Sequence, residues 1–196
     1  MGERPTPRWV MPAGVLGALI AVAAIVLTQG RPRPPSPAPL LPAPRVPVEF
    51  RVPTGWVLTT GPVPRHVPSL RREAPGFTTL ELPGKPLARL ILWASDAPLD
   101  HDPVREQEAA ARAPGARRLH RRQTSIDGHT AVDLAYLKVM GDGASAVRYL
   151  FLRAGDRSYA WLLQVGQVGS RPSEVLRRFR QASADLDRML ATTRLR

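Results

Sequence analysis

A short acidic stretch, SDAPLDHD, holds the residue types that could do chemistry. It places Asp96, Asp100 and Asp102 within seven positions and adds His101. Carboxylate oxygens at this spacing could hold Ca²⁺, and an adjacent imidazole would suit a transition metal. A metal-dependent hydrolase is therefore one hypothesis. The competing interpretation is a solvated loop, because the Ca²⁺-loop pattern is absent and Asp102 fits a helix N-cap.

A basic run forms a second candidate site. Five basic side chains fall within six positions: Arg117, Arg118, His120, Arg121 and Arg122. On a strand they would alternate between two faces, and such charge protects an edge strand against pairing with other chains. The same side chains could instead contact anionic lipid headgroups. Nucleic acid is the least favoured partner, because no aromatic side chains are interleaved with the basic ones.

Other motifs for catalysis or cofactor binding are absent from the sequence. The stretch GDGASA, residues 141–146, imitates a dinucleotide-binding fingerprint, but strands are predicted on both sides of it. The chain has no nucleophile-elbow, zinc-protease or P-loop pattern, and its lack of cysteine excludes thiolate chemistry. We therefore expect a protein without a cofactor and without enzymatic activity.

The composition indicates a folded domain but does not identify a partner. Hydrophobic residues make up 43% of the 196 positions, which is enough for a core. A formal net charge of +12 would suit nucleic acid or an anionic membrane. However, the basic residues other than Lys85 and Lys138 are all arginine, and Ala, Pro, Gly and Val are abundant. That composition is typical of a GC-rich genome, so the charge alone is weak evidence for a partner.

The N-terminal segment predicts a membrane anchor. Residues 9–28 contain no charged side chain, and about 20 apolar residues can cross the hydrocarbon core. Arg4 and Arg8 precede this run, and Trp9 stands where an interfacial aromatic belongs. A cleaved signal peptide and a buried core helix remain alternatives. We expect a tail at 1–8, one span in the lipid bilayer at 9–28, and a single-pass protein of the cell membrane with its C-terminal domain outside the cytoplasm.

A proline-rich linker at 29–47 is predicted to lead into a domain at 48–196. Short apolar runs separated by turns predict eight strands, and two segments have helical patterns. The strands are expected at 48–52, 56–60, 77–82, 87–93, 117–126, 129–139, 147–153 and 157–165, and the helices at 102–112 and 173–192.

The last helix is expected to cover the sheet. Its apolar stripe includes Phe179, Leu186 and Met189, which recur at helical spacing. Tyr159 and Trp161 share one face of their strand and need such a cover. The predicted fold class is α+β, an antiparallel β-sheet flanked by helices in an αβα sandwich, preceded by one transmembrane helix.

Two local signatures accompany this order of elements. One is FRVPTGW at residues 50–56, in which Trp56 is expected to anchor the sheet edge on the core, or alternatively to act as a ligand platform. The other is IDGHTAVDLAYLKV at 126–139, which contributes Gly128, Ala131, Leu134 and Tyr136. Together they resemble the PsbP-like superfamily, including bacterial DcrB-like exported proteins.

The resemblance implies function as well as fold. It implies an accessory or binding protein rather than an enzyme, with another envelope protein or anionic headgroups as the partner. Bacterial members are commonly lipoproteins. This chain lacks the cysteine that carries the lipid, so a membrane span would replace it.

Overall fold

The computed structural model describes residues 41–42, 46–59, 76–96, 99 and 102–196. All of these residues belong to one compact unit, Ala38–Arg196. The predicted tail and membrane span lie outside the described residues, as do most of the predicted linker, Asp100 and His101. Among the helices of the described ranges, none combines the length and the apolar character needed to cross a membrane.

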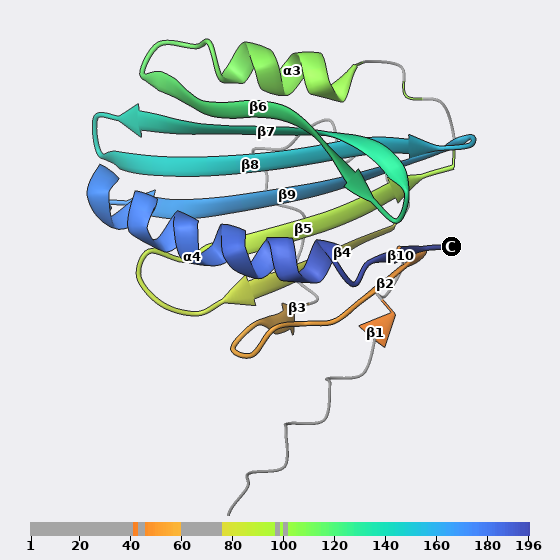
Figure 1. Ribbon diagram of the computed structural model, residues 1–196. Coiled ribbons are helices and arrows are strands. Elements are labelled where there is room, and N and C mark those ends of the chain that lie inside the picture. The colour runs from red at the N-terminus through yellow and green to blue at the C-terminus, as the bar shows by residue number, and fades with distance from the viewer. Residues whose placement is uncertain (1–40, 43–45, 60–75, 97–98, 100–101) are drawn as a thin grey trace, which may run out of the picture. The chain divides into compact units, whose positions relative to one another are not determined.

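The largest element is an antiparallel sheet with the strand order β3-β4-β5-β9-β8-β7-β6 (Figure 1). Consecutive strands from β6 to β9 pair as a meander, and β9 then pairs with β5. The predicted antiparallel α+β architecture is thus confirmed. The seven strands are β3 (Val57–Thr59), β4 (Gly76–Leu82), β5 (Ala88–Ser95), β6 (Ala116–Ile126), β7 (His129–Met140), β8 (Gly143–Ala154) and β9 (Arg157–Val168).

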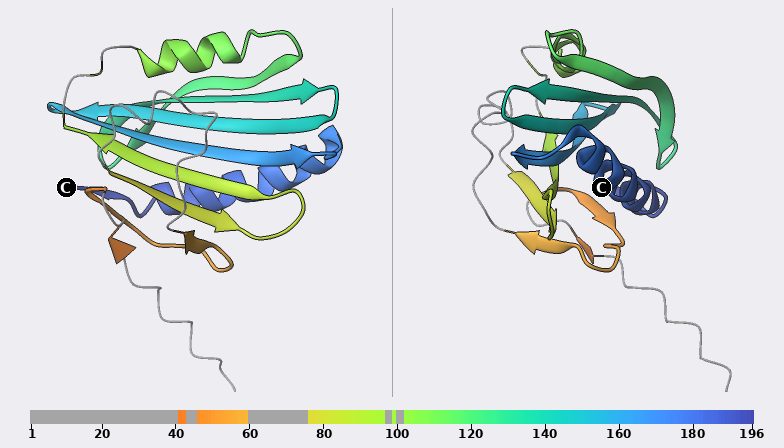
Figure 2. Two further views of the ribbon diagram at one scale, coloured as in Figure 1. Left: turned by 180° about the vertical axis from the view of Figure 1, so that it is seen from behind. Right: turned by 90° about the vertical axis from the view of Figure 1, so that its left-hand side faces the viewer.

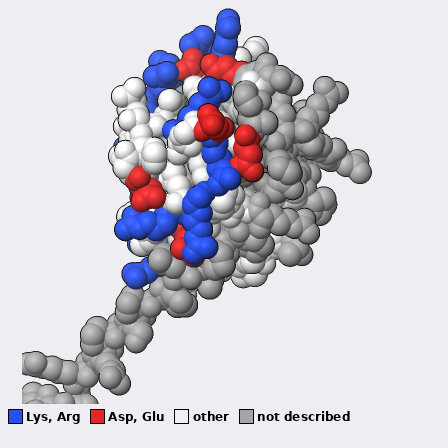
Figure 3. Space-filling model, turned by 90° about the vertical axis from the view of Figure 1, so that its right-hand side faces the viewer, with Lys and Arg blue, Asp and Glu red and all other residues white. Residues whose placement is uncertain are grey.

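A smaller sheet joins the start and the end of the domain. Its central strand, β2 (Val48–Phe50), pairs with β1 (Leu41–Pro42) and with β10 (Arg194–Leu195). β1 lies within the stretch predicted as linker. Asp127 accepts a hydrogen bond from the Leu195 amide at 2.9 Å, which fixes the C-terminal strand to the β6–β7 turn. Figure 3 shows basic and acidic side chains interspersed over this end of the molecule.

Two helices cover opposite faces of the large sheet. α4 (Pro172–Leu190) packs on β8, β9 and β5, on the concave side of the curved sheet (Figure 2). α3 (Pro103–Ala110) contacts β7 and β8, and its Val104 and Ala110 pack against the apolar cluster of the other face. The helix–sheet–helix layering therefore agrees with the prediction.

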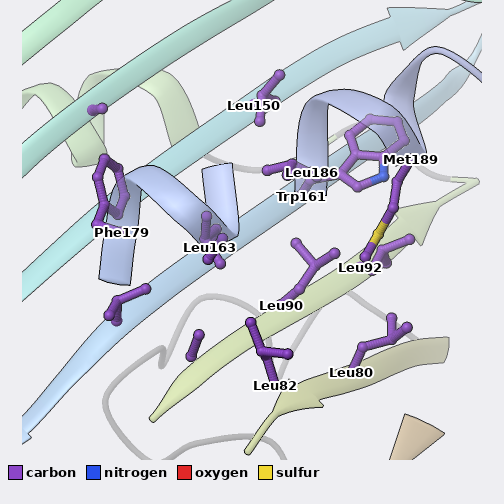
Figure 4. Close-up of a cluster of buried hydrophobic side chains, with 14 of the residues drawn as sticks. Leu80, Leu82, Leu90, Leu92, Leu150, Trp161, Leu163, Phe179, Leu186 and Met189 are labelled. Atoms are coloured by element: carbon purple, nitrogen blue, oxygen red, sulfur yellow. The ribbon is translucent and has the colours of Figure 1, made fainter. Parts of the chain in front are cut away.

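The main core lies between α4 and the sheet, as Figure 4 shows. On the helix, Phe179, Leu186 and Met189 are 6%, 0% and 2% exposed. Tyr159 and Trp161 beneath them are each 2% exposed. The predicted burial of the aromatic face by the terminal helix is confirmed. Fully burying one such side chain stabilises the fold by about 1.5–3 kcal/mol.

The opposite face has an aromatic cluster of its own. Trp93 and Phe151 have ring centroids 6.4 Å apart, and Tyr149 stacks on Phe151 at 6.5 Å. Burial raises the pKa of the Tyr149 phenol, because the charged phenolate is disfavoured away from water.

Two turns show how local sequence sets the strand pairing. Asp127 and Gly128 both have positive φ, as the two-residue hairpin predicted from this dipeptide requires. The β7–β8 connection is shorter than the one expected between the strands at 129–139 and 147–153, because β7 extends to Met140 and β8 already begins at Gly143. The strand extends this far because Ala144 and Ala146 face the core and are both fully buried.

Candidate functional site

The acidic stretch is used in part to build the fold. Asp102 caps α3, and its Oδ1 accepts hydrogen bonds from the amides of Val104 and Arg105 at 3.0 and 3.2 Å. Asp96 forms an ion pair with Arg157. Asp100 and His101 are outside the described residues, so the predicted metal site as a whole stays a prediction. Within the described ranges, no group of three or more His, Asp or Glu side chains could hold a metal ion.

Asp96 also lines a pocket of about 480 Å³ at the β8–β9 end of the sheet. Arg157 lies in the same pocket, where hydrogen bonding to Tyr159 and the contact with Asp96 raise the pKa of its guanidinium. The pocket carries both charge signs, so it could hold a small charged molecule. The lining residues are Asp96, His129, Ala154, Asp156, Arg157, Tyr159, Leu195 and Arg196.

The basic run lies on β6, which is an edge of the large sheet. A β-bulge between Arg118 and His120 shifts the register within the run. On the side of α3, Arg121 donates to Glu108 at 2.6 Å, and this hydrogen bond is the main reason that the pKa of Glu108 is lowered. Charged side chains and a bulge on an edge strand are both features that protect a sheet edge against pairing with other chains.

On the side of α4, two members of the run contact one buried carboxylate. His120 Nε2 lies 2.9 Å from Oδ1 of Asp133, and Arg122 Nε donates to Oδ2 at 3.0 Å. Three of the five basic side chains therefore contact carboxylates within the domain, Arg121 and Arg122 in ion pairs and His120 through its ring nitrogen. Arg117 and Arg118 are exposed and form no ion pair with a described residue. The anionic-surface role of the run stays a prediction.

The carboxylate of Asp133 also forms a buried two-pronged ion pair with Arg148. The guanidinium donates to both carboxylate oxygens, at 3.0 Å from Nε and 2.8 Å from Nη2. Asp133 is fully buried and Arg148 is 2% exposed. On its helix side, Arg148 donates to Asp187 at 2.8 Å and to the Ser183 carbonyl at 3.3 Å. One arginine thus joins β7, β8 and α4.

The electrostatics of this pair follow from burial and hydrogen bonding. Burial alone would raise the pKa of Asp133, but hydrogen bonds from Arg148, His120 and Arg122 outweigh it and lower the pKa to about 2. Burial likewise opposes the charge of Arg148, and its hydrogen bonds to Asp133 and Asp187 outweigh that effect and raise its pKa. Both groups therefore stay charged near neutral pH.

Neither Asp133 nor Arg148 was predicted from the sequence as a site residue. The available signal was a single charge on a strand face that is otherwise apolar, since Ala131 and Ala135 flank Asp133 on the same face. A charge at such a position requires a partner. The pairing of Asp133 with Leu150 in the β7–β8 hairpin places Arg148 diagonally next to it.

These observations define the class: an α+β domain with a seven-stranded antiparallel sheet, a helix on each face and a buried ion pair beneath α4. No family model and no curated protein matches the chain. Similar solved structures do exist.

One such structure is cyanobacterial PsbP from Synechocystis, with 13% identity, coverage of 86% of this chain and 99% of that chain, and a TM-score of 0.48. LpqN of Mycobacterium tuberculosis, involved in cell envelope biogenesis, has 12% identity, and the match covers 82% of this chain and 86% of LpqN with a TM-score of 0.49. A Pseudomonas aeruginosa protein of unknown function has 20% identity, coverage of 58% and 80%, and a TM-score of 0.44. Because these TM-scores are below 0.5, membership of the PsbP-like superfamily stays a prediction.

Proposed function

We propose that the chain is a membrane-tethered, non-enzymatic accessory or binding protein of the bacterial cell envelope. Its α+β domain is of the PsbP-like type and lies outside the cytoplasm. The sequence signatures at 50–56 and 126–139 support the family, and the uncharged run at 9–28 supports the tether.

The observation that carries the non-enzymatic part is that the carboxylate with the largest pKa shift, Asp133, lies in the interior and not in the 480 Å³ pocket. Active sites place such groups in a cleft, where they can meet substrate. Here the pKa of Asp133 is lowered to about 2 beneath α4, where Arg148 holds both carboxylate oxygens. Asp127, whose pKa is lowered mainly by the Leu195 amide, fixes the C-terminal strand. These shifts therefore report ion pairs and hydrogen bonds that stabilise the fold.

The tether is tested by extraction of bacterial membranes with alkaline carbonate. The full chain should stay in the membrane fraction. A variant with Leu19→Arg and Val22→Arg should be released, because each arginine at the centre of a span costs about 2.5–3.5 kcal/mol. A matched variant with Thr6→Arg and Gly2→Arg changes the charge equally in the tail and should remain bound. Release of the unmodified chain would contradict the tether.

A metal-dependent hydrolase using Asp96, Asp100, His101 and Asp102 is the second candidate. The position of Asp96 in the 480 Å³ pocket favours it. Metal analysis of the purified full chain separates the two functions, and we expect no stoichiometric metal. Stoichiometric metal that disappears in Asp100→Asn or His101→Ala would favour the hydrolase instead.

A further inference from the structure

One end of the large sheet gathers several turns. The β7–β8 turn lies there, and Val168, the last residue of β9, pairs with Gly143 just beyond that turn. β5 begins at the same end, where Ala88 pairs with Val165. α4 begins at Pro172, shortly after β9 ends. We call this region, opposite the β8–β9 pocket, the lysine end, because Lys85 and Lys138 lie in it.

The lysine end exposes apolar side chains on its turns. Val139 and Met140 are each 45% exposed, and Val168 is 76% exposed. These are three of the five large apolar side chains that are exposed in the described part of the chain. Val139 and Met140 end β7 and Val168 ends β9, on either side of β8, because Met140 pairs with Gly143 and Gly143 pairs with Val168. Because successive side chains alternate between faces, Met140 and Val168 lie on one face and Val139 on the other, and the three form an apolar tip at this end of the sheet.

Cationic groups surround this tip. Lys85 lies in the β4–β5 turn, Lys138 precedes Val139, and Arg117 pairs with Leu137 across the β6–β7 ladder. Arg171 is at the start of α4 and makes no capping hydrogen bond with its side chain. All four cations are exposed, and none forms an ion pair with a described residue.

The charge balance at this end favours an anionic partner. The carboxylates there are Asp142 in the β7–β8 turn and Glu174 in the first turn of α4, so cations outnumber them. The amino end of α4 adds positive potential from its free amide groups. Both lysines of an otherwise arginine-based chain lie here, which the compositional bias does not account for.

We propose that the lysine end docks on the surface of an anionic lipid bilayer. Val139, Met140 and Val168 enter the interfacial region, and Lys85, Lys138, Arg117 and Arg171 contact the headgroups. The flexible stem of lysine suits this position, because its methylenes can lie along apolar surface while the ammonium stays in water. A second copy of the chain fits less well, since it would bring these cations against one another. The inference rests on the proposed tether, which holds the domain near a bilayer.

The absence of cysteine allows site-specific labelling of the full chain. An environment-sensitive fluorophore on Val168→Cys would report the tip. A matched label on Ser125→Cys, an exposed site near the β6–β7 turn at the other end, is the control. In vesicles containing phosphatidylglycerol, the label at 168 should shift to the blue and be quenched by spin-labelled lipid. In phosphatidylcholine vesicles it should not. A water-like spectrum at 168 in anionic vesicles, or equal shifts at both sites, would overturn the proposal.

Charge reversal provides the second test. A lysine near an anionic surface contributes about 1 kcal/mol, or about fivefold in the docking equilibrium. Lys85→Glu with Lys138→Glu should therefore lower the ratio of docked to undocked domain at least about 25-fold. Arg105→Glu with Arg153→Glu changes the charge equally at exposed sites away from this end and should leave the signal unchanged. Equal loss in both variants would refute the lysine end as the contact.

Different results would refute the proposed membrane tether and the proposed docking of the lysine end. If the lysine variant stays in the carbonate-resistant membrane fraction while its label loses the blue shift, docking depends on this end and the tether is intact. If the unmodified chain is released by carbonate, the tether is wrong, whatever the label at 168 reports.

Discussion

Trp56 donates a hydrogen bond from its indole Nε1 to Oδ2 of Asp185, and the two atoms are 3.0 Å apart. Both residues are buried, at 7% and 5% exposure, and they are 129 positions apart in the chain. Arg188 holds the other oxygen of the same carboxylate. The tryptophan that ends FRVPTGW thus fastens the first segment of the domain to its last helix. The core-anchor interpretation of Trp56 is confirmed, and Asp185 is the partner that the helical pattern did not reveal.

The first prediction concerns this hydrogen bond. Trp56→Phe keeps an aromatic ring but leaves the buried carboxylate without its indole donor. Trp93→Phe is the matched control, because Nε1 of Trp93 is buried and has no hydrogen-bond partner among the described residues. We expect Trp56→Phe to lower the free energy of unfolding by about 1.5–3 kcal/mol more than Trp93→Phe. Urea unfolding of the full chain in mild detergent measures this difference, and equal losses would show that the bond contributes nothing.

The second prediction concerns the buried ion pair. Asp133→Asn keeps the shape of the side chain but leaves Arg148 facing a neutral group in the interior. We expect a loss of about 3 kcal/mol in the free energy of unfolding. Asp187→Asn removes a partner of Arg148 whose side chain is 56% exposed, and should cost at most about 1 kcal/mol. The same urea titration compares the two variants. A larger loss of unfolding free energy in Asp187→Asn than in Asp133→Asn would show that Asp187 is the more important partner of Arg148.

The third prediction is the acid dependence of stability. The pKa of Asp133 is lowered from 3.8 to about 2 in the folded domain, so the unfolded chain takes up this proton first as the pH falls. The stabilisation is therefore complete above about pH 4 and is lost as the pH falls towards 2. In Asp133→Asn, the dependence of unfolding free energy on pH should be shallower by up to about 1.4 kcal/mol per pH unit in this window. Parallel profiles for the two proteins would contradict this.

The fourth prediction concerns Gly166 in β9. Its φ is +142°, and an added Cβ would lie 2.3 Å from the carbonyl oxygen of Ala144. Gly155 also has positive φ, +62°, but no atom of the described residues lies within 4 Å of an added Cβ. Gly155→Ala should cost about 1–2 kcal/mol from backbone strain alone. Gly166→Ala must also displace a neighbouring strand and should be the more destabilising. Thermal unfolding compares the two variants. Similar melting temperatures would show that β8 can move to accommodate the added methyl group at little cost in stability.

Local patterns predicted most of the individual elements. The apolar stripe was sufficient to predict helix α4, because its buried residues recur every three or four positions, as at Val175, Phe179 and Ala182. The β6–β7 hairpin was predictable because Asp127 and Gly128 supply the backbone conformation that its turn needs. Asp102 was correctly assigned as a cap from its position before a proline.

Relationships between distant segments could not be predicted in this way. No local pattern indicates that β9 pairs with β5, or that Leu41 and Pro42 pair with β2. The partners of the basic run were also hidden, because Asp133 and Glu108 become neighbours of β6 only after the sheet and α3 assemble. The sequence showed which charges were available but not which of them the fold uses internally.

We propose above that an anchor holds this domain outside the cytoplasm. A reporter fused after Arg196 tests it most directly, with alkaline phosphatase in one fusion and green fluorescent protein in another. We predict that the phosphatase fusion is active and the fluorescent fusion is dark, because the phosphatase matures only outside the cytoplasm. A fluorescent fusion with an inactive phosphatase would place the domain inside the cell and contradict the proposed function.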